Sequence, residues 1–197
     1  MTKKEENAII LDYLPYGYPL EGKMMPIAQA IGEENFTLLQ LIPRKGITLQ
    51  LKERVYIGDG KRDKIYYILG RLPADKLTEN SKIQLEEFID KVIEEKEKEF
   101  VEFFNKSTAI NTRIHQIELL PGYGKKHMKE ILQIREEKPF ESFEDMKKRI
   151  PSLPDPKTAI QKRMIEELTG DERHRLFVFY SKIKNKKKWI KKQNKYK

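Results

Sequence analysis

Hydrophobic and polar positions divide the chain into a first part with short apolar runs and a second part with helical spacing. The short runs lie at residues 8–14, 26–31, 36–42, 54–58 and 64–70, separated by segments that contain glycine or proline. Short apolar runs between turn residues are typical of β-strands. Residues 1–72 are therefore predicted to form a small β-barrel of the OB-like or S1-like kind, within a chain of the α+β class.

Beyond residue 72, apolar side chains recur three and four positions apart. Such a stripe runs through residues 77–104, and the remaining positions of that stretch are mostly acidic. The spacing predicts one long helix with Thr78 as its N-cap. Because an acidic surface repels phosphate, residues 73–108 are interpreted as a connecting helix between two domains. The stripe consists of Leu85, Phe88, Ile89, Val92, Ile93, Phe100 and Phe103.

The same helical spacing continues on both sides of a tight turn at residues 121–124. Ile110, Ile114 and Ile117 predict a helix before the turn, and Pro121 ends it because proline lacks an N–H. The helix after the turn begins with N–H groups that have no partner inside the helix, and the helix dipole adds positive potential there. These donors form a site for an anion, and a phosphodiester suits it best.

A second reversal is predicted at residues 150–156. Ser142 is a suitable N-cap for the helix before it, and the helix after it ends at Gly170. Because this second turn lacks the Gly-x-Gly pair, no phosphate binding is predicted there. A late strand over 171–181 and a polybasic tail over 182–197 complete the chain.

The segment Leu120-Pro121-Gly122-Tyr123-Gly124-Lys125-Lys126 resembles the hairpin of the helix-hairpin-helix family. With the second reversal, residues 109–170 resemble a tandem copy of that motif. The resemblance implies that backbone amides of the hairpin contact nucleic-acid phosphates without sequence preference. One departure is Met128, where the family usually carries a small residue. The alternative is a tight turn between two packed helices that binds no ligand.

Over about the first 180 residues, the chain also resembles a mostly archaeal family, the domain of unknown function 655 (DUF655). The resemblance extends from the barrel through residues 54–64 to the hairpin. It implies the same order of domains and a function in binding RNA or another nucleic acid.

The net charge of +9 comes from the end of the chain. Residues 182–197 contain nine lysines and no acid, and without them basic and acidic residues balance. A nucleic-acid surface on the rest of the chain must therefore come from local clusters of charge. In the barrel, cations near strand ends, together with tyrosines, could hold a single strand by charge and stacking. The alternative is that these tyrosines pack in the sheet and the cations are solvated.

Composition excludes several classes of site. The chain has no cysteine, which rules out disulfides, thiol catalysis and cysteine-based zinc sites. Its three histidines lack metal-ligand spacing, and no Walker A, Rossmann or Gly-x-Ser-x-Gly pattern occurs. No signal peptide and no apolar stretch of bilayer length is visible. We therefore expect a cytoplasmic protein without a metal, a cofactor or a membrane partner.

The function expected from these patterns is non-enzymatic, sequence-nonspecific binding of RNA or DNA. Two alternatives stay open: an enzyme of nucleic-acid repair or processing with an unrecognised active site, and an interaction adaptor associated with ribosomes. The expected binding residues are Gly122, Tyr123, Gly124, Lys125, Lys126, Arg44, Lys45, Arg54, Lys61, Arg62, Lys64 and Tyr66.

Overall fold

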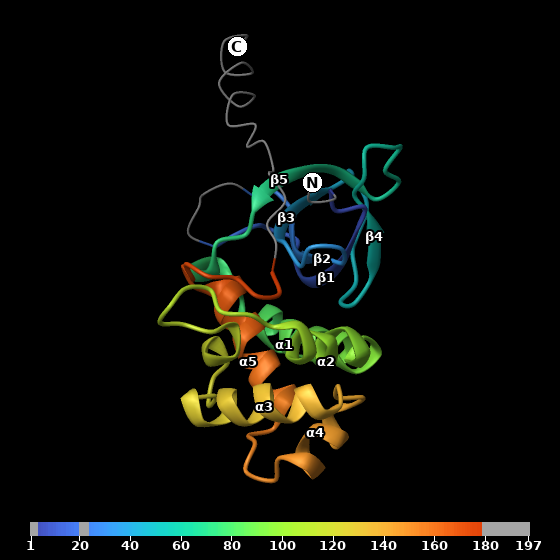
Figure 1. Ribbon diagram of the computed structural model, residues 1–197. Coiled ribbons are helices and arrows are strands. Elements are labelled where there is room, and N and C mark those ends of the chain that lie inside the picture. Colours follow the sequence, from blue (N-terminus) through green and yellow to red (C-terminus); the bar gives the residue numbers. More distant parts are fainter. Residues whose placement is uncertain (1–3, 20–23, 179–197) are drawn as a thin grey trace. The chain divides into compact units, whose positions relative to one another are not determined.

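The computed structural model describes residues 4–19 and 24–178 and has a mixed α+β architecture (Figure 1). Its contacts divide the chain into two compact units. Of the described residues, the first unit contains those up to Leu85 together with Val178, and the second covers Glu86–Phe177.

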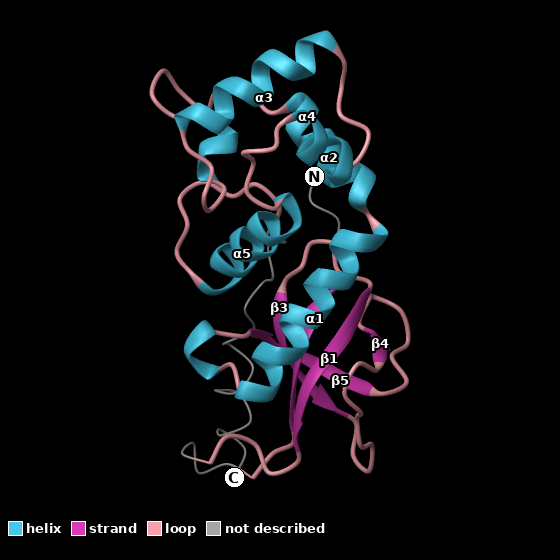
Figure 2. Ribbon diagram, turned by 90° about the horizontal axis from the view of Figure 1, so that it is seen from below, coloured by secondary structure: helices cyan, strands magenta, loops and turns pink. Residues whose placement is uncertain are grey.

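The first unit is built on a five-stranded antiparallel sheet in the order β4-β1-β2-β3-β5. Figure 2 shows that the strands curl around one another rather than lie flat. All five strands were predicted from the apolar runs, and the structure confirms them. They are β1 (Asn7–Leu14), β2 (Ile27–Gly32), β3 (Leu38–Pro43), β4 (Arg54–Tyr56) and β5 (Ile65–Arg71).

Apolar side chains from all five strands form the core inside the curled sheet. Three irregularities in pairing help the sheet to bend. One lies in β1 between Ile10 and Asp12, and two lie in the pairing of β3 with β5, at Gln40/Leu41 and at Ile42/Pro43. The core includes Ala8, Ile10, Ala28, Ala30, Leu39, Leu41, Val55 and Ile65, each almost fully buried. A short 3-10 turn, η1 (Ala74–Lys76), follows β5.

The long helix expected over residues 77–104 is in fact two helices, α1 (Glu79–Glu95) and α2 (Glu97–Lys106). The break is at Lys96, with φ −113° and ψ 27°. It lies in an uninterrupted run of charged residues, 94–99, where no apolar side chain anchors the backbone to a core. The predicted N-cap is confirmed, because the Thr78 hydroxyl accepts a hydrogen bond from the Ser81 N–H at 3.1 Å.

The second unit continues with η2 (Gln116–Leu119), α3 (Lys125–Glu137), α4 (Phe143–Arg149) and α5 (Pro156–Thr169). The helix predicted before the first turn is wrong, since η2 is a single 3-10 turn. Asn111 explains the difference: its side-chain oxygen accepts from the Arg113 and Ile114 N–H groups at 2.8 and 3.0 Å. These bonds hold the backbone in a loop instead of a helix.

Two expectations concern the end of the chain. The late strand predicted over 171–181 is not present in its described part, because residues 171–178 contain no strand. Instead, the Leu176 and Phe177 N–H groups donate to the buried carboxylate of Glu167. The predicted polybasic tail, 182–197, lies outside the described residues.

Candidate nucleic-acid interface

The first hairpin is a tight turn held from inside by two apolar side chains. Leu120 and Tyr123 are both buried, and the Tyr123 N–H donates to the Leu120 carbonyl at 3.0 Å. Between them Gly122 has φ +85°, in the left-handed region that favours glycine. The conformation of this turn therefore follows from its own residues, and α3 begins two residues after Tyr123.

The N-terminus of α3 is uncapped and open. Its N-cap is Gly124, which has no side chain to accept from the first-turn N–H groups. A methyl group added at Gly124 would meet no atom within 4 Å. Lys125 and Lys126 are exposed beside these amides, and Lys126 is 4.0 Å from the Glu130 carboxylate, an exposed and weak pair. The structure therefore brings four of the five predicted hairpin residues to one open, positive surface.

Tyr123, the remaining predicted hairpin residue, is placed differently. Its side chain is only 4% exposed, and its hydroxyl donates to the Pro154 carbonyl at 2.9 Å. Burial, with the negative charge of Asp155, raises the pKa of Tyr123. The Tyr123 side chain thus joins the two turns and is not available to a ligand.

The second turn repeats the backbone pattern of the first one. The Leu153 N–H donates to the Ile150 carbonyl at 3.0 Å, and both side chains are buried. Its helix α5, however, is capped: the Asp155 carboxylate accepts from the Thr158 N–H at 2.9 Å. Burial raises the pKa of Asp155. The hydrogen bonds from Thr158 and the charge of Lys147 lower it by a larger amount, so the net pKa is below the ordinary value. A capped, negatively charged turn is unsuited to an anion.

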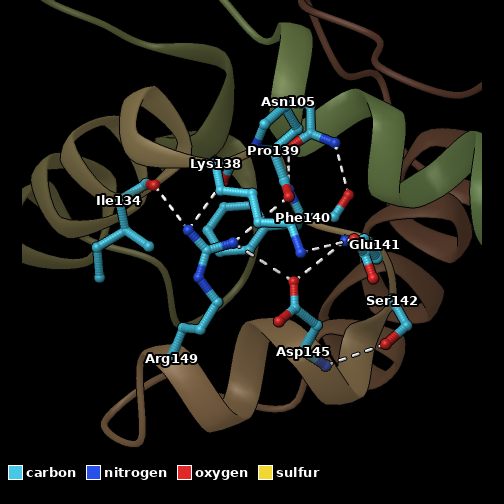
Figure 3. Close-up of polar contacts among 9 residues, drawn as sticks. All are labelled: Asn105, Ile134, Lys138, Pro139, Phe140, Glu141, Ser142, Asp145 and Arg149. Atoms are coloured by element: carbon cyan, nitrogen blue, oxygen red, sulfur yellow. Dashed lines mark hydrogen bonds and ion pairs between the residues drawn. The ribbon is translucent and has the colours of Figure 1, made fainter.

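Arg149 fixes the far end of α3 (Figure 3). Its Nη2 donates to the Ile134 and Lys138 carbonyls, both at 2.8 Å, and its guanidinium lies 4.8 Å from the centre of the Phe140 ring. Asn105 holds the same segment by bonds to the N–H and carbonyl of Phe140 at 2.8 and 2.9 Å. These contacts satisfy carbonyl groups at the end of α3 and hold the loop that leads to α4.

A second arginine, Arg135, holds the last turn of α3. Arg135 donates through Nη1 to the Phe104 and Ser107 carbonyls at 2.8 and 2.9 Å. Because two arginines anchor the C-terminal end of α3 and its central residue Ile131 is buried, the open N-terminus belongs to a helix that is held in place. Sequence reasoning missed Arg135, Arg149 and Asn105, since their partners lie far along the chain and no motif marks them.

His115 shapes the segment that enters the first hairpin. Its Nδ1 accepts from the Ile117 N–H at 3.2 Å, and the backbone N–H of His115 donates to the Glu118 carboxylate at 2.9 Å. Burial and the charge of Arg135 lower the pKa of His115. The imidazole is thus neutral near pH 7, as an accepting Nδ1 requires.

The sheet unit brings together part of the predicted set. Arg44 and Lys45, just after β3, line one groove with Tyr66 of β5. Arg62 lies beside them, because its carbonyl accepts from Arg44 Nε at 2.8 Å. Lys61, its neighbour in the chain, is exposed.

Two other predicted cations of the sheet unit are engaged with acids. Arg54 forms an ion pair with Glu33 at 2.7 Å, and Lys64 pairs with Glu53. Their charge is therefore partly neutralised within the unit, and they are weaker candidates than Arg44 and Lys45.

Two further observations concern metal binding and membrane spans in the described residues. Within residues 4–19 and 24–178, no three histidine or carboxylate side chains gather as a metal site would need. In the same part of the chain, every helix is too short or too polar to cross a bilayer.

Comparison with known proteins gives consistent matches over most of the chain. A family model described as "Protein of unknown function (DUF655)" matches residues 4–179. "Uncharacterized protein MJ0038" from Methanocaldococcus jannaschii is 42% identical over 177 residues, which cover 90% of this chain and 80% of that protein. The crystal structure of Af1531 from Archaeoglobus fulgidus, assigned to the same family, matches with a TM-score of 0.76 and 43% identity. That match covers 88% of this chain and 99% of Af1531.

Proposed function

This chain belongs to the DUF655 family of proteins of unknown function, and we propose that it is a non-enzymatic protein that binds RNA or DNA. Binding is to the phosphate backbone, without preference for sequence. The first hairpin provides the main contact and the sheet unit a second one.

The observation that carries this proposal is the open N-terminus of α3. Glycine at the N-cap leaves first-turn N–H groups without a side-chain acceptor, and the space beside Gly124 is open. A helix N-terminus attracts anions through these donors and through its dipole, and Lys125 and Lys126 add two positive charges. A phosphodiester satisfies both the donors and the charge.

We further propose that residues 109–170 are a tandem helix-hairpin-helix module in which the 3-10 turn η2 takes the place of the first helix. The shared backbone turn at Leu120–Tyr123 and Ile150–Leu153 supports the repeat. Only the first hairpin holds a phosphate in this proposal. The second one, with Asp155 as its cap, supports the first through the bond from Tyr123 to Pro154.

The sheet unit is proposed to be an OB-like barrel. A Greek-key barrel of five strands, left open between β4 and β5, has the order β4-β1-β2-β3-β5 that the sheet has. Barrels of this kind bind single strands with basic and aromatic surface residues, which Arg44, Lys45 and Tyr66 supply.

The test is a comparison of two double variants with equal loss of charge. Lys125→Ala with Lys126→Ala removes the cations beside the open helix end. Lys147→Ala with Lys148→Ala removes two exposed lysines from α4, which form ion pairs with Asp155 and Glu144. Affinity for mixed-sequence RNA and DNA is measured by fluorescence anisotropy at one salt concentration. We expect the first variant to bind about tenfold more weakly and the second to bind within about twofold of the parent. Equal affinities for the two variants would contradict the proposal.

A further inference from the structure

A groove in the sheet unit combines an exposed aromatic ring with an apolar floor. It has a volume of about 390 Å³ and lies between the start of β2, the end of β3 and β5. Ile42, Pro43, Ile47 and Met25 provide apolar walls. Its size is within the range of small-molecule sites, roughly 300–1,000 Å³.

Tyr66 presents its ring to this groove. Its side chain is 63% exposed, although it stands on a strand whose first residue, Ile65, is fully buried. The ring of Tyr67 packs edge-on against it, with centroids 5.4 Å apart and planes at 72°. This contact restrains the Tyr66 ring while leaving it open to a flat partner.

Arg44 and Lys45 provide two cations at the rim of the groove. Within residues 4–19 and 24–178, neither Arg44 nor Lys45 forms an ion pair with a carboxylate, and no acidic residue lines the groove. Arg44 uses Nε on the Arg62 carbonyl, which leaves the rest of its guanidinium for other contacts. The nearby Lys64, in contrast, is paired with Glu53. The groove is thus apolar inside and positive at its edge.

We infer that this groove receives one unpaired base of a single-stranded nucleic acid. The base stacks on Tyr66 over the apolar floor, and Arg44 and Lys45 contact the phosphates next to it. A paired base inside a duplex has both faces covered by its neighbours, so it cannot enter. The inference rests on the proposed function and deepens it: the chain prefers single strands over duplexes.

The test uses the full chain, a labelled single strand of mixed sequence and the matching duplex, at one salt concentration. Tyr66→Ala removes the stacking surface, while Tyr66→Phe keeps it. Tyr16→Ala is the control, because Tyr16 is 72% exposed in the same unit and does not line the groove. We expect Tyr66→Ala to weaken single-strand binding about tenfold and leave duplex binding unchanged. Tyr66→Phe and Tyr16→Ala should bind like the parent.

A second measurement needs no variant. A single strand that carries 5-iodouracil is crosslinked to the parent protein by ultraviolet light, and the modified peptide is identified by mass spectrometry. The inference predicts crosslinks at Tyr66.

The outcomes separate the inference from the proposed function. Equal single-strand binding by Tyr66→Ala and the parent, or equal losses on single strand and duplex, would overturn the inference alone. Crosslinks that avoid the groove would do the same. A parent protein that binds neither strand form would overturn both.

Discussion

At the scale of single residues, Gly122 and Gly124 lie two positions apart, and glycine serves a different purpose at each position. Gly122 has φ +85°, whereas Gly124 is extended at φ −103°. We predict that Gly122→Ala lowers the free energy of unfolding by about 1–2 kcal/mol, because a side chain is strained in the left-handed region. Gly124→Ala should cost less than about 1 kcal/mol, as a change of N-cap does, but should weaken nucleic-acid binding severalfold. Urea unfolding and fluorescence anisotropy measure the two effects.

The contrast between the two variants is what the account requires. Loss of stability in Gly124→Ala as large as in Gly122→Ala would show that both glycines serve the turn alone. Full affinity in Gly124→Ala would show that the open space beside it holds no phosphate.

His115 gives a prediction about pH. Burial and Arg135 place its pKa below the ordinary value of 6.5, so the unfolded chain binds a proton at a higher pH than the folded chain does. The contribution of neutral His115 is therefore fully present above pH 6.5 and is lost as pH falls toward the folded pKa. We predict that stability declines from pH 7.5 to 5.5, by at most about 1.4 kcal/mol per pH unit from this group.

The matched variant for this prediction is His115→Asn, which keeps an N-cap acceptor and does not titrate. Urea unfolding at the two pH values should show a smaller decline for the variant than for the parent. An identical decline in both proteins would mean that His115 does not titrate as described.

At the scale of elements, Arg149 holds the junction between α3 and α4. We predict that Arg149→Met lowers the free energy of unfolding by about 2–3 kcal/mol, because the Ile134 and Lys138 carbonyls lose charged donors. Lys148→Met on the same helix is the control, since Lys148 is exposed and forms an ion pair with Glu144 on the surface. Thermal unfolding followed by circular dichroism compares them. A similar midpoint for both variants would contradict the role given to Arg149.

Elements that depend on local pattern were predictable from the sequence. The five strands were found because short apolar runs alternate with glycine- and proline-containing turns, and the cap at Ser142 was found from its position before an acidic turn. The Ser142 hydroxyl indeed accepts from the Asp145 N–H at 3.0 Å. The helix before the hairpin was predicted wrongly, since Ile110, Ile114 and Ile117 have helical spacing but the Asn111 side chain takes the backbone donors.

Features that depend on distant partners were not predictable. Tyr123 looked like a surface residue of the hairpin, but its ring packs against Phe104 and its hydroxyl donates to the Pro154 carbonyl, 31 positions later. The pairing of Arg54 with Glu33 is of the same kind, since the two residues meet through the folding of the sheet. The hairpin itself was recognisable because its proline, glycines and lysines are consecutive.

At the scale of the whole molecule, the charge of the chain is uneven. Residues 182–197 carry nine lysines and no acid. We predict that deleting them weakens binding to every sequence and reduces the salt dependence of affinity, because fewer counterions are released. Anisotropy titrations at several salt concentrations measure both quantities. Unchanged affinity and an unchanged salt slope would show that this segment takes no part in binding.

The central claim is that backbone amides at the start of α3 hold a phosphate, and nuclear magnetic resonance tests it most directly. Mixed-sequence oligonucleotide is titrated into the ¹⁵N-labelled full chain, and the amide shifts are followed. We predict large shifts at Gly124, Lys125 and Lys126, and small ones at Lys157 and Thr158, where Asp155 caps the second hairpin's helix. Shifts of equal size at the two helix ends, or none at Gly124–Lys126 while the oligonucleotide binds, would contradict it.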